Sequence, residues 1–165
     1  MSETYATNEK TPTTGIPPVV SGPGLGVSPG HGYTYKMPFR KCRKTDGITY
    51  PIAICFVCKT VVKPNREEYS KTGAHGTFYY VHKHQLSFVV LKQTNSGKRS
   101  VQFIGNIPEH LAYLVKEAWL EYETDVRFIE DIVNDYLYLS REGREENLVL
   151  SEVNGKVSLI EGGEW

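Results

Sequence analysis

The sequence lacks any long hydrophobic run. No apolar stretch approaches the roughly 18 residues that a membrane-spanning helix requires. Residues 1–4 also lack the basic and then apolar regions of a secretory signal. We therefore expect a soluble protein with no membrane partner, located in the cytoplasm or elsewhere inside a cell, including the interior of a virion.

Cysteine is scarce, with three residues in a chain of 165. An odd and small number does not suit a disulfide framework in a chain of this length. Two of the three, Cys55 and Cys58, are spaced as C-x-x-C. This spacing indicates metal ligands or free thiols rather than a disulfide.

Recognisable catalytic motifs are also missing. Residues 22–26 are rich in glycine, but the proline among them argues against a phosphate-binding loop between a strand and a helix. No Ser, His and Asp arrangement has a recognisable local context. We therefore expect a protein that is not an enzyme.

The hydrophobic content of 39% and the charged content of 23% are typical of a globular protein. The chain is long enough for one domain of ordinary size.

The composition changes near residue 35. Residues 1–34 are rich in Pro, Gly, Thr and Ser and poor in large apolar groups, which predicts a flexible arm. Such an arm is either a disordered terminus or a segment that lies along a partner or neighbouring subunit. Residues 35–165 are expected to form a single globular domain, with a basic, β-rich, zinc-binding part at 35–105 and an acidic, helical part at 106–165.

The globular part has strand patterns followed by helix patterns. β-Branched, alternating segments predict strands near residues 48–55, 77–81, 86–92 and 100–104, and the turn at 45–47 predicts a hairpin over 39–55. Helical periodicity from residue 106 predicts one long or two shorter amphipathic helices, with Thr124 and Asp125 as a possible second start. A turn at residues 154–155 predicts a C-terminal β-hairpin. The expected class is α+β, with a small antiparallel sheet that carries a zinc-binding turn.

Charge is unevenly distributed although the formal net charge is zero. Residues 36–99 hold thirteen Lys and Arg against three Asp and Glu, whereas residues 108–165 hold five against fourteen. A basic region of this kind is typical of nucleic-acid binding, and nearby aromatic rings could stack on bases. The candidate cations are Lys36, Arg40, Lys41, Arg43 and Lys44, and the candidate rings are Tyr33, Tyr35, Phe39 and Tyr50.

The same charge division has other interpretations. The acidic helices could pack against the basic sheet and neutralise it within one chain. Alternatively, the basic surface could bind an acidic protein, or basic and acidic faces could join head to tail in a homo- or hetero-oligomer.

The strongest pattern is a candidate metal site. Cys55 and Cys58 have the spacing at which both thiolates of a turn reach one zinc ion, and His82 and His84 lie two apart, on one face of a strand. Together they form a possible tetrahedral Cys2His2 set. The fourth position is open among His84, Cys42 and His75. The alternatives are small buried thiols with unrelated histidines, or a redox dithiol.

A short segment around the histidines resembles a known motif. Gly76, five further residues and then His82-x-His84 resemble the opening of the cupin metal motif, which implies a β-barrel with a catalytic metal. The glutamate of that family is absent, because Phe88 and Val89 stand where it is expected.

These observations favour a non-enzymatic, zinc-finger-like binding module whose basic surface engages nucleic acid or an acidic protein. The first alternative is a structural subunit of a viral particle or ribonucleoprotein, with the arm extending over its neighbours. The second is a metal-dependent enzyme that uses His82 and His84.

Overall fold

The computed structural model describes residues 32–40 and 47–162, which form antiparallel sheets and helices. One sheet has three strands in the order β1-β5-β4, and a second has four in the order β3-β2-β6-β7. The strands of the first are β1 (Tyr33–Arg40), β4 (Arg66–Tyr69) and β5 (His75–His82). Those of the second are β2 (Ile48–Cys55), β3 (Thr60–Val62), β6 (Ser87–Gln93) and β7 (Arg99–Ile104). The expected small sheet is therefore two sheets.

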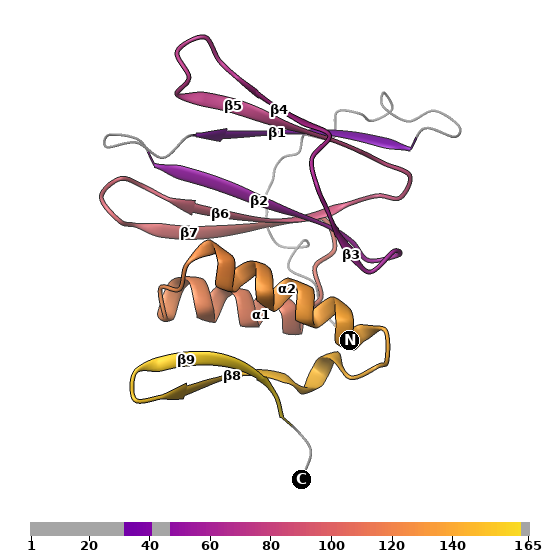
Figure 1. The fold of residues 1–165 in the computed structure, drawn as a ribbon, viewed down its shortest axis with the longest axis vertical. Coiled ribbons are helices and arrows are strands. Elements are labelled where there is room, and N and C mark those ends of the chain that lie inside the picture. The colour runs from indigo at the N-terminus through magenta and orange to yellow at the C-terminus, as the bar shows by residue number, and fades with distance from the viewer. Residues whose placement is uncertain (1–31, 41–46, 163–165) are drawn as a thin grey trace.

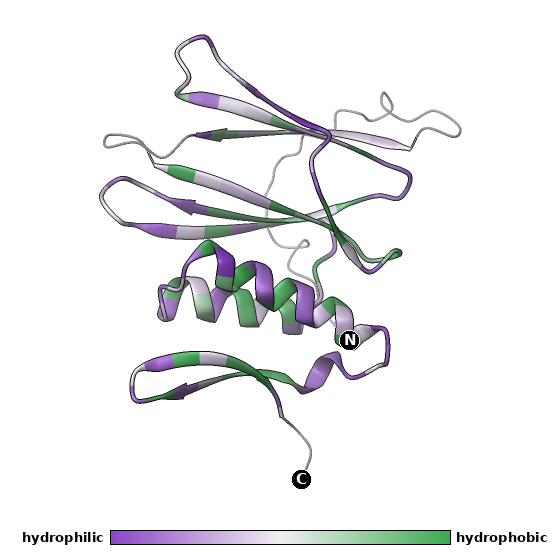
Figure 2. Cartoon of the chain, in the orientation of Figure 1, coloured by the Kyte–Doolittle hydropathy of each residue, from purple (hydrophilic) through white to green (hydrophobic). Residues whose placement is uncertain are grey.

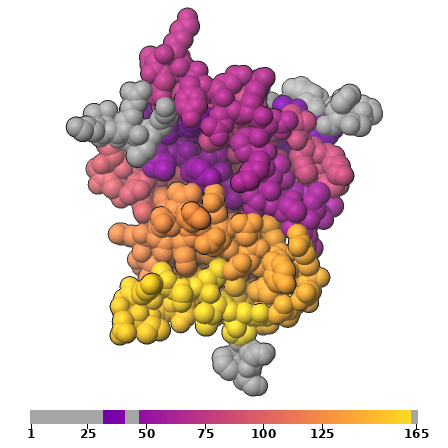
Figure 3. Space-filling model, in the orientation of Figure 1, coloured from indigo at the N-terminus to yellow at the C-terminus, as the bar shows by residue number. Residues whose placement is uncertain are grey.

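The elements stack in layers. The three-stranded sheet lies over one face of the four-stranded sheet, and helices α1 (Glu109–Lys116) and α2 (Val126–Ser140) cover the other face (Figure 1). The hairpin of β8 (Leu148–Val153) and β9 (Lys156–Glu161) packs beyond the helices. In the space-filling view the three-stranded sheet and this hairpin lie at opposite ends of the molecule (Figure 3).

Strands β2 and β6 are buried on both faces because a layer covers each side of them. On one side, Ala53, Phe88 and Val90 join the core shared with the three-stranded sheet. On the other, Ile54 and Val89 join the core shared with the helices. A strand covered twice has a continuous apolar run rather than alternation, as the sequence of both strands shows. The helices, by contrast, alternate hydrophobic and hydrophilic colouring, and β4 is largely hydrophilic (Figure 2).

The hairpin expected over residues 39–55 does not form. β1 pairs with β5, whereas β2 pairs with β3 and β6, so the two strands belong to different sheets. The physical reason is burial, because Tyr35, Met37 and Phe39 of β1 face the core between the sheets. β1 also begins at Tyr33, so two residues assigned to the arm lie in a strand; the arm's residues 1–31 lie outside the described part.

The helical region contains two α-helices rather than one. A π-helical segment, Glu117–Glu121, follows α1, and the Asp125 side chain accepts a hydrogen bond of 2.9 Å from the Phe128 N–H at the start of α2. Asp125 thus caps the second helix at the position expected from the sequence. The Arg99 guanidinium lies 3.8 Å from the Trp119 ring centroid and donates to the carbonyl oxygens of Trp119 and Thr124. These contacts hold the segment between the two helices against β7. Among the described residues, no helix is both long and apolar enough to span a membrane.

Candidate metal centre and basic face

Four potential metal ligands converge where the two sheets meet. Cys55 is the last residue of β2, Cys58 lies in the turn after it, His82 is the last residue of β5, and His84 follows two residues later. Their sulfur and nitrogen atoms all lie within 4.8 Å of one another. The four residues are therefore close enough to hold one metal ion. Cys55 is buried and the other three are half-buried.

The distances suit a tetrahedral ion. Zinc bonds of about 2.3 Å to sulfur and about 2.0 Å to nitrogen place neighbouring sulfur and nitrogen ligands about 3.6 Å apart in a tetrahedron. The Cys58 sulfur lies 3.6 Å from His82 Nε2 and 3.3 Å from His84 Nδ1. The Cys55 sulfur lies 3.6 Å from His84 Nδ1. The two histidines would therefore bind through different ring nitrogens.

The turn between the cysteines is fixed by backbone hydrogen bonds. The Cys58 N–H donates to the Cys55 sulfur at 3.2 Å, and the Lys59 N–H donates to the Cys55 carbonyl oxygen at 2.8 Å. An N–H donor directed at sulfur stabilises the thiolate form that binds metal. Many zinc-binding turns have a glycine after the second cysteine, whereas this chain has Lys59, which adopts a left-handed backbone with φ of 60°.

Two of the four candidate ligands have shifted pKa values. The hydrogen bond with Cys55, together with burial, raises the pKa of the Cys58 thiol. Burial, with the nearby His84 and Lys83, lowers the pKa of His82, which favours the neutral imidazole that can bind metal. A metal ion must therefore displace a proton from Cys58 but meets an available lone pair on His82.

The alternative fourth ligands have different outcomes. His75 pairs with Arg40 at the opposite end of β5, and seven residue steps of about 3.3 Å separate it from His82 by about 23 Å. His75 is therefore wrong as a ligand, because a straight strand keeps its ends apart. Cys42 lies outside the described residues.

The glycine of the cupin-like segment has a packing explanation. A Cβ atom on Gly76 would lie 2.5 Å from the Phe39 ring and 2.5 Å from the Glu68 carbonyl oxygen. Only glycine allows β1, β5 and β4 to approach at this point. Phe88 and Val89, which stand at the position of the cupin glutamate, are fully buried in the two hydrophobic cores.

No protein-family model matches the chain, and neither curated proteins nor solved structures gave a significant match.

The expected nucleic-acid residues are only partly described. Lys36 and Arg40 are exposed on β1, whereas Lys41, Arg43 and Lys44 lie outside the described residues. The prediction that these four aromatic rings stack on bases is mostly wrong. Tyr35 and Phe39 are 4% and 7% exposed in the core between the sheets, because the alternation of β1 directs them inward. Tyr50 donates its hydroxyl hydrogen to Glu130, and Tyr33 packs against the same core.

The sequence interpretation missed Tyr79. Lys36, Tyr79 and Arg66 are paired across β1, β5 and β4, so all three lie on the outward face of the three-stranded sheet. The Lys36 ammonium lies 5.8 Å and the Arg66 guanidinium 4.5 Å from the Tyr79 ring centroid. We call Lys36, Arg40, Arg66 and Tyr79 the basic face. The alternation that placed Phe78 and Tyr80 inward could have identified Tyr79 as outward.

The acidic helices do not cover this face. They pack on the four-stranded sheet through the apolar side chains of Ile52, Ile54, Val89 and Leu91, on the side opposite the three-stranded sheet (Figure 1). In the described residues, the acidic helices therefore pack against the four-stranded sheet, as one alternative expected, but they leave the basic face on the three-stranded sheet uncovered. Arg99 is half-buried and donates to the Trp119 carbonyl oxygen, so its guanidinium is already engaged within the protein.

Proposed function

We propose that this protein is a non-enzymatic binding module in which one zinc ion joins the two sheets. The observation that carries the proposal is the Cys2His2 cluster, with two ligands from the end of β2 and its turn and two from the end of β5 and beyond. Thiolate with imidazole is a ligand set that favours zinc over magnesium or calcium.

A structural role suits the cluster better than a catalytic one. Four protein ligands fill a tetrahedral zinc ion, whereas catalytic zinc usually keeps a position for water or substrate. The segment after His84 supplies no carboxylate where the cupin motif has its glutamate. Phe88 and Val89 stand there instead, and both are buried in the cores. These features support a protein that is not an enzyme.

The basic face is the surface that we propose binds single-stranded nucleic acid. Tyr79 supplies a ring at its centre, and Lys36, Arg40 and Arg66 supply positive charge around it. Stacking of a base on an aromatic side chain contributes about 1–3 kcal/mol, and the cations provide a salt-dependent attraction to phosphate. The exposed ion pair between Arg66 and Glu68, at 3.0 Å, would have to yield to a phosphate.

The metal part is tested by zinc content. We expect one zinc per chain in the native protein, measured by elemental analysis, and its loss in Cys58→Ser and His82→Ala. Lys83→Gln is the matched control, because Lys83 is exposed between the two histidines and is not a ligand. Native protein without bound metal, and unable to take up zinc, would contradict this part.

The nucleic-acid part is tested separately by fluorescence anisotropy with a labelled single-stranded oligonucleotide. We expect affinity to fall steeply between 50 and 200 mM salt, by an order of magnitude or more on counterion-release grounds. Tyr79→Ala should weaken binding about tenfold through lost stacking. Lys98→Gln, in the turn between β6 and β7, should not change it. Absence of binding at low salt would refute this part and leave the metal part standing.

The charge distribution favours a second candidate, a subunit of a larger assembly. In the described residues, positions 32–105 hold ten Lys and Arg against two Glu, and positions 106–162 hold five against thirteen Asp and Glu. The three-stranded sheet lies at one end, and the acidic helices with the hairpin beyond them form the opposite part of the molecule (Figures 1 and 3), which suits head-to-tail contact. Salt-sensitive oligomers in analytical ultracentrifugation would support it, and a monomer at high concentration and low salt would oppose it.

A further inference from the structure

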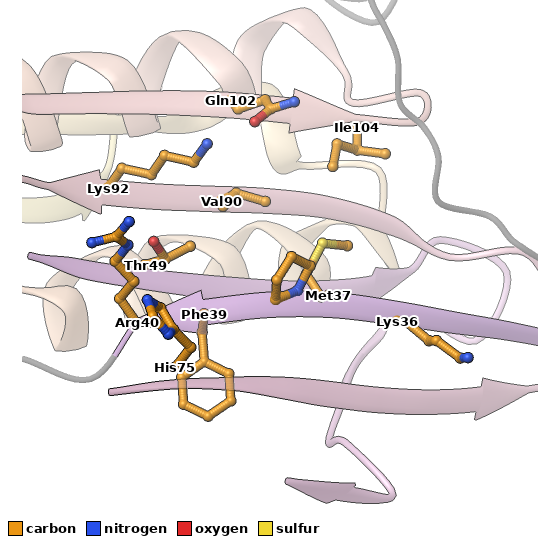
Figure 4. Close-up of a pocket in the computed structure, with 11 residues that line it drawn as sticks. Lys36, Met37, Phe39, Arg40, Thr49, His75, Val90, Lys92, Gln102 and Ile104 are labelled. Carbon is orange, nitrogen blue, oxygen red and sulfur yellow. The ribbon is translucent and has the colours of Figure 1, made fainter. Parts of the chain in front are cut away.

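A cleft of about 630 Å³ opens between the two sheets on the side of β1 and β7. One wall is β1, an edge strand in the described part of its sheet, and the other is the face of β2, β6 and β7 that the three-stranded sheet leaves uncovered (Figure 4). This volume lies within the range of small-molecule sites.

The cleft is apolar in its floor and cationic at its rim. Its floor is formed by Met37, Phe39, Val90 and Ile104. At one end Arg40, His75 and Lys92 approach Thr49, whereas Met37 and Ile104 lie further along (Figure 4). Thr49 and Lys92 are directly paired across β2 and β6, so their side chains share one face. None of the described residues that line the cleft is Asp or Glu.

We propose that the cleft binds a small amphiphilic oxyanion. Its aliphatic body would lie over the apolar floor, and its carboxylate or phosphate head would bind Arg40, Lys92 and the Thr49 hydroxyl. Charge complementarity supports an anion, because a cationic rim without lining carboxylates disfavours neutral or positive head groups. The cleft shares Arg40 and Lys36 with the basic face but differs from it in its apolar floor. The proposal does not rest on the proposed zinc or nucleic-acid functions.

An aliphatic body fits better than a nucleobase. A base needs an open aromatic face, but the ring of Phe39 packs against Phe78, with centroids 4.1 Å apart, and against Tyr69, with centroids 5.4 Å apart. Phe39 is only 7% exposed. The remaining floor side chains are aliphatic or thioether groups, which pack against hydrocarbon without a preferred stacking geometry.

A peptide strand added to β1 is also disfavoured. Pro38 lies in the part of β1 that lines the cleft and has no N–H to donate. Proline in an edge strand is a common means of preventing strand addition. The unpaired edge of β1 therefore lacks one of the backbone hydrogen bonds that an added strand would need. Ligand selection in the cleft then depends on the side chains.

Titration calorimetry on the full chain, as purified, tests the proposal. The probes are decanoate and decyl phosphate, with decyltrimethylammonium as the same tail with opposite charge and acetate as a head without a tail, all below micelle formation. We expect binding of one or both anionic amphiphiles and none of the other two. The tighter anion identifies the head group as carboxylate or phosphate.

Variants locate the binding in the cleft. Lys92→Gln should weaken the anion about tenfold, the size expected for one charged hydrogen bond. Ile104→Trp should block the floor, with circular dichroism as the check on folding. Lys98→Gln, an exposed lysine in the turn beside β6, and Tyr79→Ala on the basic face should leave binding unchanged. The proposal is overturned if neither anion binds at millimolar concentration, if the cationic amphiphile binds equally, or if Lys92→Gln has no effect.

Discussion

Lys59 occupies the position after the second cysteine in a left-handed conformation, with φ of 60°. This conformation brings its N–H to the Cys55 carbonyl oxygen and so closes the turn around the two cysteine sulfurs. For a residue with a Cβ the left-handed region costs roughly 1–2 kcal/mol. Two contacts offset part of this: the Lys59 ammonium reaches the Phe56 carbonyl oxygen at 3.5 Å, and Arg141 donates to the Lys59 carbonyl oxygen at 3.0 Å.

The effect of substituting Lys59 on the free energy of unfolding should therefore depend on the backbone conformations open to the new residue rather than on its charge. We expect Lys59→Gly to keep zinc and to raise the free energy of unfolding by up to about 1 kcal/mol, because glycine adopts this conformation without strain. Lys59→Val should lower it by about 1 kcal/mol or more, since a β-branched residue is strained there. Urea unfolding of the zinc-loaded proteins measures both. Lys63→Val, exposed just after β3, is the control, and a loss in Lys59→Gly equal to that in Lys59→Val would contradict the argument.

At the scale of elements, β2 and α2 are joined by a polar contact as well as by apolar packing. The Tyr50 hydroxyl donates to a Glu130 carboxylate oxygen across the interface between the sheet and the helix. Burial raises the pKa of Tyr50 to about 12, and the hydrogen bond and negative charge of Glu130 add to the effect. The folded protein therefore retains this proton over a pH range in which the unfolded chain loses it.

The raised pKa of Tyr50 makes the stability of the protein depend on pH. Between the unfolded pKa of 10.0 and the folded value of about 12, the native state binds more protons than the unfolded state, so stability falls as pH rises through this window. Tyr50→Phe should be less stable at neutral pH by about 1 kcal/mol, for one lost hydrogen bond. It should also lose less stability than the wild type between pH 10 and 11.5. Urea midpoints across this range measure the difference.

Tyr138→Phe provides the matched control, because Tyr138 is an exposed tyrosine, 57% accessible, on the same helix. Its stability profile should follow the wild type. Parallel profiles for Tyr50→Phe and the wild type would show that the contact with Glu130 does not hold the proton.

The elements themselves were largely accessible from local sequence, because their signals are local. β-Branched, apolar or alternating segments predicted β2, β5, β6 and β7 but not β3 or β4. The cap at Asp125 and the turn at residues 154–155 predicted the second helix and the terminal hairpin. The partition of strands into two sheets was not accessible. Whether β1 pairs with β2 or with β5 depends on which arrangement buries Tyr35, Met37 and Phe39, and this is decided by residues about 40 positions away.

The candidate metal site was likewise predictable where its signals are local and not where they depend on distant residues. Ligand type and spacing predicted Cys55, Cys58, His82 and His84, because C-x-x-C and H-x-H each act within a few residues. Excluding His75 required the strand that separates it from His82. Tyr79 was not predicted for a different reason: its place between Lys36 and Arg66 depends on the pairing of three strands.

At the scale of the whole molecule, the cluster joins layers that otherwise meet through one core. Cys55 belongs to the four-stranded sheet and His82 to the three-stranded sheet, so an ion held by the cluster would bridge them. Within the described residues, the three-stranded sheet packs on the rest of the protein through this core, with side chains such as Met37, Phe78 and Tyr80. The four-stranded sheet is held additionally by the core that it shares with both helices. Loss of the ion should therefore affect the two sheets unequally.

Removal of zinc with a chelator should loosen the three-stranded sheet first. Structural zinc contributes apparent binding free energies of about 10–16 kcal/mol in small zinc domains, comparable with the whole stability of an ordinary domain. We expect faster amide hydrogen exchange in β1, β4 and β5, detected by mass spectrometry, while α1 and α2 remain protected by their own core. Cys58→Ser should reproduce this pattern without chelator, whereas Lys83→Gln loaded with zinc should remain protected throughout. Unchanged exchange after verified zinc removal would rule out a structural role for the ion, and equal loss of protection in the helices would show that both cores unfold as one unit.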